Sequence, residues 1–262
     1  MVEISVGKHM KAQETYKKFA EFYDIYTKDF QEDISLYKYL THDCINILEI
    51  GCGTGRILKE LVNKNKIITG VDISKEMLEI AKEKLKIEIQ NKSIILLEHD
   101  FSNNSIIQKY DICLITWYTF NYISKNAVKF LKNISKNLNN DSMIVMDLFY
   151  PNTLKKPEIN NKWVEKEIYL ENKKYLIKDK RNIKNNVEER IQIFEIEGRS
   201  TKISTNRFYY SKADIKNILI KAGYSEIKFI ENYDVSTIHT LGKNENTEND
   251  YICIAKNALS IA

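Results

Sequence analysis

From residue 44 to residue 150, short runs of apolar residues alternate with longer stretches in which apolar residues recur every three or four positions. The short runs are typical of strands buried on both faces, and the longer stretches of helices with one buried face. The predicted strands are 44–50, 67–72, 93–100, 110–116 and 142–149. The predicted helices are 55–65, 74–87 and 125–138. Strands separated by helices in this order predict a parallel sheet covered on both faces.

The flanking segments follow other patterns. Before residue 44, apolar residues recur at helical spacing, among them Tyr16, Tyr23 and Tyr26, which predicts a helical cap. From residue 163 to residue 210, apolar and charged residues alternate, which predicts antiparallel strands with one solvated face. The last predicted elements are a helix at 211–223, with Ser211 as its N-cap, and strands at 225–233 and 250–257.

Together these elements predict an α/β fold with a Rossmann-like, seven-stranded, mostly parallel sheet and helices on both faces. A helical cap spans residues 1–43, the core spans 44–150 and 211–262, and a β-rich antiparallel insertion spans 151–210. Ligands of such sheets bind at the carboxyl ends of the strands, near the point where the strand order reverses. We therefore expect the functional site at that edge.

Composition narrows the class of partner. The net charge is +4, with 40 basic and 36 acidic residues, a mild balance that disfavours a nucleic-acid partner. No apolar run approaches the roughly 20 residues that cross a bilayer, and the N-terminus lacks the apolar segment of a signal peptide. We expect a cytoplasmic protein without a membrane partner. The four cysteines form no CxxC pair and the four histidines are scattered, which predicts reduced thiols and no metal site.

The strongest chemical signal is a glycine loop directly after the first predicted strand. It reads Glu49-Ile-Gly51-Cys-Gly53-Thr-Gly55 and precedes a helix, so a ligand can approach the backbone and the free N–H groups of the helix start. Asp72 ends the next strand, where a carboxylate can accept hydrogen bonds from both hydroxyls of a ribose.

These residues resemble the first two motifs of the class I S-adenosylmethionine-dependent methyltransferases. The resemblance implies that the glycine loop lies beside the amino-acid half of S-adenosylmethionine and that Asp72 binds its ribose. It also implies an adenine site and a wall beside the methyl donor, from residues that end the later strands. The implied cofactor-binding residues are Tyr16, Tyr26, Glu49, Gly51, Cys52, Gly53, Gly55, Asp72, Ile73, Met77, Asp100, Phe101, Thr116 and Trp117.

The layout is most similar to that of the nucleotide-sugar amine N-methyltransferases. Their β-rich insertion also follows a strand that ends in an acid and aromatic residues, here at 147–151, and their return segment resembles 206–211. The stretch 22–26 resembles the N-terminal helix that folds over the cofactor in many small-molecule members of the wider family. One departure is that Tyr122 stands where the nucleotide-sugar enzymes often carry a histidine, so no role of that histidine is carried over.

Methyl transfer from a sulfonium is an in-line displacement, and most of its acceleration comes from alignment of the reactants. Aromatic faces suit a cationic donor. We expect catalytic roles for Tyr23, Tyr122 and Asp147 and acceptor contacts from Tyr118, Arg207 and Tyr209. Arg207 is a candidate for binding a phosphate or carboxylate. No residue stands out as a general base, which leans toward an amine acceptor.

The sequence therefore predicts an enzyme that moves a methyl group from S-adenosylmethionine to an amine or hydroxyl of a small molecule, leaving S-adenosylhomocysteine. The acceptor is expected to be a sugar or a phosphorylated or nucleotide-linked metabolite, and the protein a monomer or a homodimer. Alternatives are methylation of RNA or protein, and cofactor binding without catalysis. A nicotinamide-dependent oxidoreductase would need GxGxxG, but Arg56 occupies the sixth place. The amino-methylating nucleic-acid enzymes carry Asn/Asp-Pro-Pro-aromatic where this chain reads 116–119 without proline.

Overall fold

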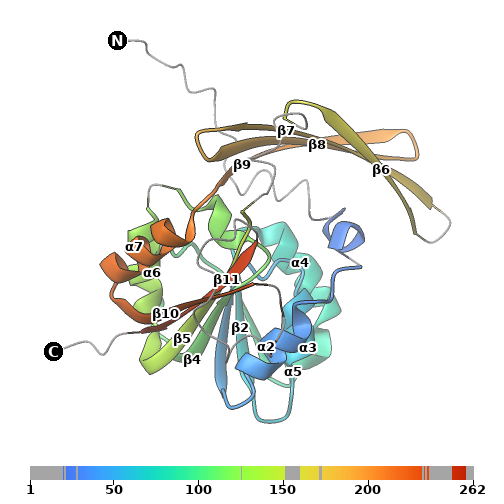
Figure 1. Cartoon of the computed structure of the whole chain (residues 1–262). Coiled ribbons are helices and arrows are strands. Elements are labelled where there is room, and N and C mark those ends of the chain that lie inside the picture. The colour runs from blue at the N-terminus through green and yellow to red at the C-terminus, as the bar shows by residue number, and fades with distance from the viewer. Residues whose placement is uncertain are drawn as a thin grey trace.

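The structure is a computed structural model that describes residues 20, 22–27, 29–124, 126–150, 160–170, 173–231, 233, 235 and 250–257. Figure 1 shows two parts, an α/β core and a separate antiparallel sheet on one side of it. The prediction for Tyr16 and the segment 151–159 lie outside the described residues.

The core sheet contains the seven predicted strands. They are β1 (Asn46–Ile50), β2 (Ile67–Asp72), β3 (Ile94–Glu98), β4 (Tyr110–Ile115), β5 (Leu138–Leu148), β10 (Tyr224–Glu231) and β11 (Tyr251–Asn257). Their order is β10-β11-β5-β4-β1-β2-β3, and β11 alone runs antiparallel to its neighbours. The predicted mostly parallel sheet is confirmed. Its strand order reverses between β1 and β4, so the loops that follow these two strands flank a crevice.

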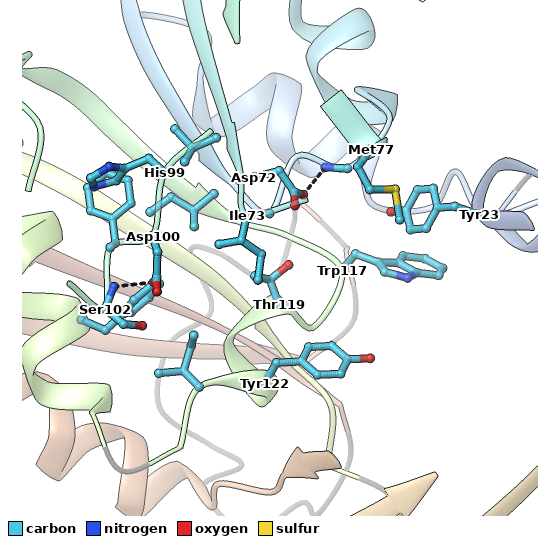
Figure 2. Close-up of a pocket in the computed structure, with 17 residues that line it drawn as sticks. Tyr23, Asp72, Ile73, Met77, His99, Asp100, Ser102, Trp117, Thr119 and Tyr122 are labelled. Carbon is cyan, nitrogen blue, oxygen red and sulfur yellow. Dashed lines mark hydrogen bonds between the residues drawn. The ribbon is translucent and has the colours of Figure 1, made fainter. Parts of the chain in front are cut away.

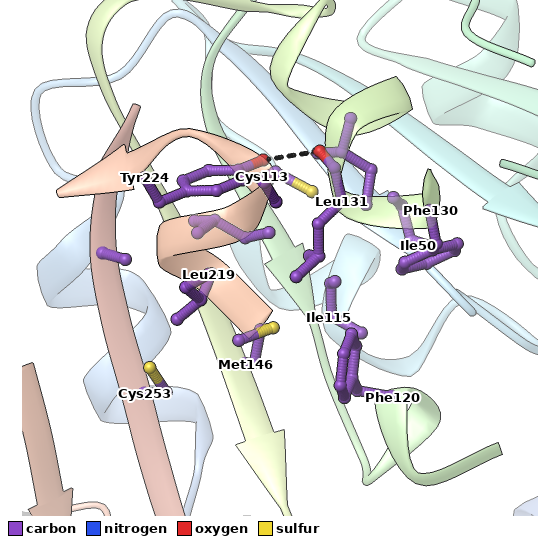
Figure 3. Close-up of a cluster of buried hydrophobic side chains, with 14 of the residues drawn as sticks. Ile50, Cys113, Ile115, Phe120, Phe130, Leu131, Met146, Leu219, Tyr224 and Cys253 are labelled. Carbon is purple, nitrogen blue, oxygen red and sulfur yellow. Dashed lines mark hydrogen bonds between the residues drawn. The ribbon is translucent and has the colours of Figure 1, made fainter. Parts of the chain in front are cut away.

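Helices cover both faces of the sheet. They are α2 (Ile34–Leu40), α3 (Arg56–Leu61), α4 (Lys75–Lys84), α5 (Lys86–Gln90), α6 (Ala127–Ser135) and α7 (Lys212–Ala222), with the 3₁₀ turn η1 (Thr119–Tyr122). In Figure 1, α6 and α7 lie on one side of the sheet, and α2 to α5 lie on the other. A buried apolar cluster fills each interface. Figure 3 shows the cluster under α6 and α7, where the Tyr224 hydroxyl donates to the Leu131 carbonyl over 3.1 Å.

Local capping signals are seen at two of the described helices, α4 and α7. Ser211 caps α7 in a capping box with Asp214, and Gly223 ends it in a left-handed conformation. Ser74 caps α4, as predicted. The expected single helix at 74–87 was wrong in one respect, since it divides at Leu85 into α4 and α5. Leu85 is fully buried and packs against Gly55, a long-range contact that overrides the local helical pattern.

The insertion is an antiparallel meander of β6 (Trp163–Leu170), β7 (Lys173–Lys184), β8 (Val187–Ile196) and β9 (Arg199–Phe208). Two tight turns join its last three strands, at 185–186 and 197–198, and all four turn residues have positive φ. This is the backbone geometry that two-residue hairpins require. The inner face of the sheet packs on the helical residues 22–27, where Phe22 stacks on Phe194 at 4.9 Å.

One buried amide ties the insertion to the core. Asn121 of η1 donates through Nδ2 to the carbonyls of Phe149 and Phe208 and accepts from the Phe149 amide. Phe149 follows β5 before the insertion, and Phe208 ends β9 at its return. In the part of the chain that the structure describes, no helix is both long and apolar enough to cross a membrane.

Candidate functional site

A cavity of about 250 Å³ opens at the carboxyl ends of the core strands. Figure 2 shows its lining, with Asp72 and Met77 after β2, His99 and Asp100 after β3, and Trp117 after β4. It is lined by Tyr23, Ile50, Gly51, Gly53, Val71, Asp72, Ile73, Met77, His99, Asp100, Phe101, Ser102, Trp117, Thr119, Tyr122, Ile123 and Phe130. The cavity therefore extends across the ends of four neighbouring strands, from β3 to β4.

The glycine loop needs glycine for two separate reasons. Gly51 has φ +74°, and a Cβ there would lie 2.6 Å from Thr119 Cγ2, so only glycine lets the loop after β1 touch the loop after β4. Gly55 has φ +83° and stands at the start of α3, where a Cβ would meet Leu85. At Gly53, with φ +54°, a Cβ would lie 3.5 Å or more from its nearest neighbour, Tyr23.

Asp72 fastens the glycine loop to β2. Its Oδ2 accepts from the Gly53 amide over 2.9 Å, and its Oδ1 accepts from the Ser74 amide over 2.8 Å. Burial raises the pKa of Asp72, and these two backbone hydrogen bonds act in the opposite direction. Each carboxylate oxygen retains a further lone pair, and the side chain lines the cavity, so Asp72 can accept hydrogen bonds from a ligand.

Glu49 carries a buried oxygen without a hydrogen-bond partner in the described residues. Its Oε1 accepts from the Thr116 hydroxyl over 2.8 Å, whereas Oε2 has no partner. The side chain is 1% exposed, and burial raises the pKa of Glu49 to about 8. An unpaired buried carboxylate oxygen is costly, so this one is suited to accept from a donor that a ligand brings beside the glycine loop.

The far end of the cavity is built by the residues after β3. Asp100 accepts from the Ser102 amide over 2.8 Å and from Asn103 Nδ2 over 3.1 Å. The rings of His99 and Phe101 meet edge to face at 4.8 Å. Three strand spacings separate this end from the loop after β4, a distance of about 14 Å.

At the near end, Trp117 forms the wall. Its indole packs edge-on against Phe30 at 4.5 Å, and the Arg56 guanidinium lies 5.2 Å from its ring. Asp33 holds Arg56 in place with two hydrogen bonds of 2.9 and 2.6 Å. The wall therefore joins the N-terminal segment, the start of α3 and the loop after β4.

The structure gathers about half of the sequence-predicted site residues in the cavity lining. Those in the lining are Tyr23, Gly51, Gly53, Asp72, Ile73, Met77, Asp100, Phe101, Trp117 and Tyr122. The described ones outside it are Tyr26, Glu49, Cys52, Gly55, Thr116, Tyr118, Asp147, Arg207 and Tyr209. Glu49 and Thr116 bond to each other directly beneath the glycine loop, whereas Tyr118 turns away and donates to Asp250 over 3.1 Å.

Arg207 lies on the inner face of the insertion sheet in a buried ion pair. Its Nε donates to Glu188 Oε1 over 2.8 Å, and the Tyr209 hydroxyl donates to the other oxygen of the same carboxylate. Glu188 is fully buried and Arg207 is 4% exposed. Arg190 forms a second such pair with Asp179 and donates to the Tyr26 hydroxyl over 3.0 Å. The charge of Arg207 is thus compensated within the protein.

Sequence reasoning missed several lining residues. Ser102 and Thr119 follow strands at the same edge as the predicted residues, so the rule that placed Asp100 and Trp117 also marks their segments. Ile123 and Phe130 belong to the segment after η1 and to α6, and the sequence carried no signal for them. Within the described residues, no three metal-binding side chains cluster together.

Comparison with known proteins agrees with this geometry. Residues 47–141 match the family described as a methyltransferase domain. The chain is 26% identical over 194 residues to a malonyl-[acyl-carrier protein] O-methyltransferase of Ilyobacter polytropus, covering 70% of this chain and 73% of that protein. Against several other curated relatives, the match spans about half of the relative's length.

Two solved structures are similar over nearly the whole chain. An S-adenosylmethionine-dependent methyltransferase from Clostridium acetobutylicum has a TM-score of 0.74 at 21% identity, covering 93% of this chain and 99% of that one. An S-adenosylmethionine-bound amino pentose methyltransferase from Micromonospora echinaspora has a TM-score of 0.68 at 13% identity, covering 91% and 96%. Residues 47–141 therefore match a methyltransferase domain, and the chain as a whole has the same fold as solved S-adenosylmethionine-dependent methyltransferases.

Proposed function

We propose that this protein transfers a methyl group from S-adenosylmethionine to a nitrogen or oxygen of a small molecule. The observation that supports this most strongly is the direct hydrogen bond between the glycine loop and Asp72 beside an open cavity. The unpaired Glu49 oxygen beneath the same loop adds an acceptor for a ligand ammonium group.

The residues present fit each part of this cofactor. Asp72 would accept from the ribose hydroxyls, and Asp100 from the adenine amino group. Ile73 and Met77 would flank the adenine, across from Phe101. Glu49 Oε2 and the glycine loop would hold the methionine end. The span of about 14 Å from β3 to β4 suits an extended nucleoside that carries an amino-acid tail.

When bound, S-adenosylmethionine would supply an electrophilic methyl group on a positively charged sulfur. The protein's own contribution is then alignment and the exclusion of water. Trp117 and Tyr23 present aromatic rings to the lining, which suits a cationic donor. Tyr122 also lines the cavity and lies on η1, where the neighbouring Asn121 donates to the Phe208 carbonyl at the end of the insertion. Tyr122 is thus placed to meet an acceptor that enters between core and insertion.

The acceptor nucleophile is proposed to be an amine. The lining side chains that could act as a general base are Asp72, His99 and Asp100. Asp72 ends β2 and the other two follow β3, so all three lie toward the ribose and adenine end. No carboxylate or imidazole of the described lining follows β4, where the acceptor would stand. A neutral amine needs no general base to attack, whereas a hydroxyl usually does. The similarity to an amino pentose methyltransferase supports an amine on a sugar-type molecule.

Calorimetry tests the cofactor first. S-adenosylhomocysteine is expected to bind the wild-type protein, and NAD is expected not to bind. Asp72→Asn keeps one acceptor oxygen and Asp72→Ala keeps none, so affinity should fall in that order. Binding of NAD, or equal affinity in all three proteins, would contradict the proposal. Transfer of a labelled methyl group to amino sugars, to matched hydroxyl sugars and to bulk RNA then tests the acceptor, and the amino sugars should be preferred.

A further inference from the structure

Trp117 adopts an unusual backbone conformation in the cavity wall. Its φ is +50°, and the next residue, Tyr118, has φ +60°. Bulky residues avoid this left-handed region, and it persists where the surroundings fix it. Two such residues in succession, directly after β4 and beside the proposed methyl donor, indicate that a specific contact holds the turn.

That contact is a carboxylate on the neighbouring strand. Asp147 lies near the end of β5, is 1% exposed and does not line the cavity. Its Oδ2 accepts from the Trp117 amide over 3.0 Å and from the Tyr233 hydroxyl over 3.2 Å. The other oxygen, Oδ1, is buried and makes no hydrogen bond of standard geometry within the described residues, although the buried Tyr37 hydroxyl lies beside the same carboxylate. Because Oδ2 lies within hydrogen-bond distance of two donors from different segments, it is suited to hold a strained amide in place.

Both partners of Asp147 pack against one further ring. Phe30 meets the Trp117 indole at 4.5 Å and the Tyr233 ring at 5.7 Å, in both cases edge to face. The Arg56 guanidinium lies against both rings, 5.2 Å from Trp117 and 5.5 Å from Phe30. Asp147 Oδ2 therefore holds two groups at once. It bonds to the backbone of Trp117, and it bonds to Tyr233, whose ring packs on the same Phe30 ring as Trp117.

From this geometry we infer that Asp147 is a positioning residue that holds Trp117 in the cavity wall, rather than the catalytic acid or base that its sequence position suggests. The inference rests on the proposed function in one respect, namely that the wall faces a bound methyl donor. A general base must reach the acceptor, and Asp147 is covered by the residue that it positions. This positioning role requires an acceptor oxygen at the place of Oδ2. It can therefore be tested separately from the negative charge of the side chain.

Asparagine and glutamate variants separate position from charge. Asp147→Asn loses the charge but keeps one carbonyl oxygen, and both donors bond to a single oxygen in the native protein. Asp147→Glu keeps the charge but displaces the oxygens by one methylene. Asp147→Ala removes both. The chain has two tryptophans, so Trp163→Phe leaves Trp117 as the only tryptophan reporter. Trp163 is 46% exposed on the edge strand β6, far from the cavity lining.

The experiment measures tryptophan emission, acrylamide quenching and S-adenosylhomocysteine affinity in the Trp163→Phe background. We expect Asp147→Ala to shift Trp117 emission to the red, increase its quenching and weaken the affinity about 10-fold. Asp147→Glu should change all three in the same direction, and it replaces the alanine variant if that chain does not fold. Asp147→Asn should restore the native emission and keep the affinity within about threefold.

Two outcomes would overturn the inference. In the first, the alanine and glutamate variants leave Trp117 emission unchanged. In the second, the asparagine variant changes emission as much as they do, which would make charge rather than position the cause. The emission is read without ligand, so it decides the role of Asp147 even if no variant binds S-adenosylhomocysteine. If the protein with native Asp147 also fails to bind S-adenosylhomocysteine, that result refutes the proposed function alone.

Discussion

Substitution of Gly51 by alanine tests how the cavity is assembled. Gly51 has φ +74°, where an L-residue costs about 1–2 kcal/mol. Its new Cβ would also lie 2.6 Å from Thr119 Cγ2 and 3.0 Å from Thr119 Cβ, so the loops after β1 and β4 must separate. Overpacking of this kind typically costs a further ~1–3 kcal/mol. We therefore expect Gly51→Ala to lower the free energy of unfolding by about 2–5 kcal/mol.

Two other glycines provide matched controls. Gly198 has φ +76° in a hairpin turn with no atom within 4 Å of a new Cβ, so Gly198→Ala carries the backbone cost without the clash. Gly53 has φ +54° and only ordinary contacts, so Gly53→Ala should resemble Gly198→Ala in stability. Because Gly53 lines the cavity, its alanine variant should nevertheless lose cofactor affinity.

Urea unfolding followed by far-UV circular dichroism gives the three free energies, and calorimetry gives the affinities. Gly198 lies in the insertion and Gly53 lies in the same loop as Gly51, so Gly53→Ala is the decisive comparison. Equal destabilisation by Gly51→Ala and Gly53→Ala would show that the contact with Thr119 does not limit the loop. The explanation of the glycine at position 51 would then be wrong.

Further predictions concern the buried charges. Asp72→Ala should weaken cofactor binding by about 1–3 kcal/mol in calorimetry, through lost ribose hydrogen bonds. Burial raises the pKa of Glu49 from 4.5 to about 8, so the native state holds a proton that the unfolded chain has released. Stability should therefore fall as pH rises from about 4.5 to about 8, and urea midpoints should show a smaller fall in Glu49→Gln. Glu188→Ala leaves the buried Arg207 without its carboxylate and should lower the free energy of unfolding by about 3–5 kcal/mol in urea unfolding. The control Glu197→Ala breaks an exposed pair with Lys173 and should lower it by less than about 1 kcal/mol.

Local patterns in the sequence predicted the fold well. Continuous apolar runs marked β1 to β5, because parallel strands in the centre of such a sheet are buried on both faces. The alternation after residue 163 marked the meander, because one face of an antiparallel sheet remains solvated. The division of the helix at Leu85 escaped prediction because it depends on a contact with Gly55, which is distant in sequence.

The candidate site was predictable only in part. Residues that follow the strands, such as Asp72 and Asp100, occupy places that topology dictates. The partners of buried polar groups were not predictable, because pairs such as Arg207 with Glu188 depend on the register of two strands. The hydrogen bond between Asp147 and the Trp117 amide likewise requires the left-handed turn at Trp117, which no sequence pattern predicted.

The hydrogen bonds of Asn121 bear on how this architecture can diversify. They join Phe149, where the chain leaves the core, to Phe208, where it returns. These two ends of the insertion are therefore held together by Asn121 and not by the hairpins of the meander. The hairpins can therefore lengthen, shorten or change their inner-face side chains while the two ends of the insertion stay joined. The core can keep the same cofactor-binding site while the insertion sheet changes to accommodate different acceptor molecules.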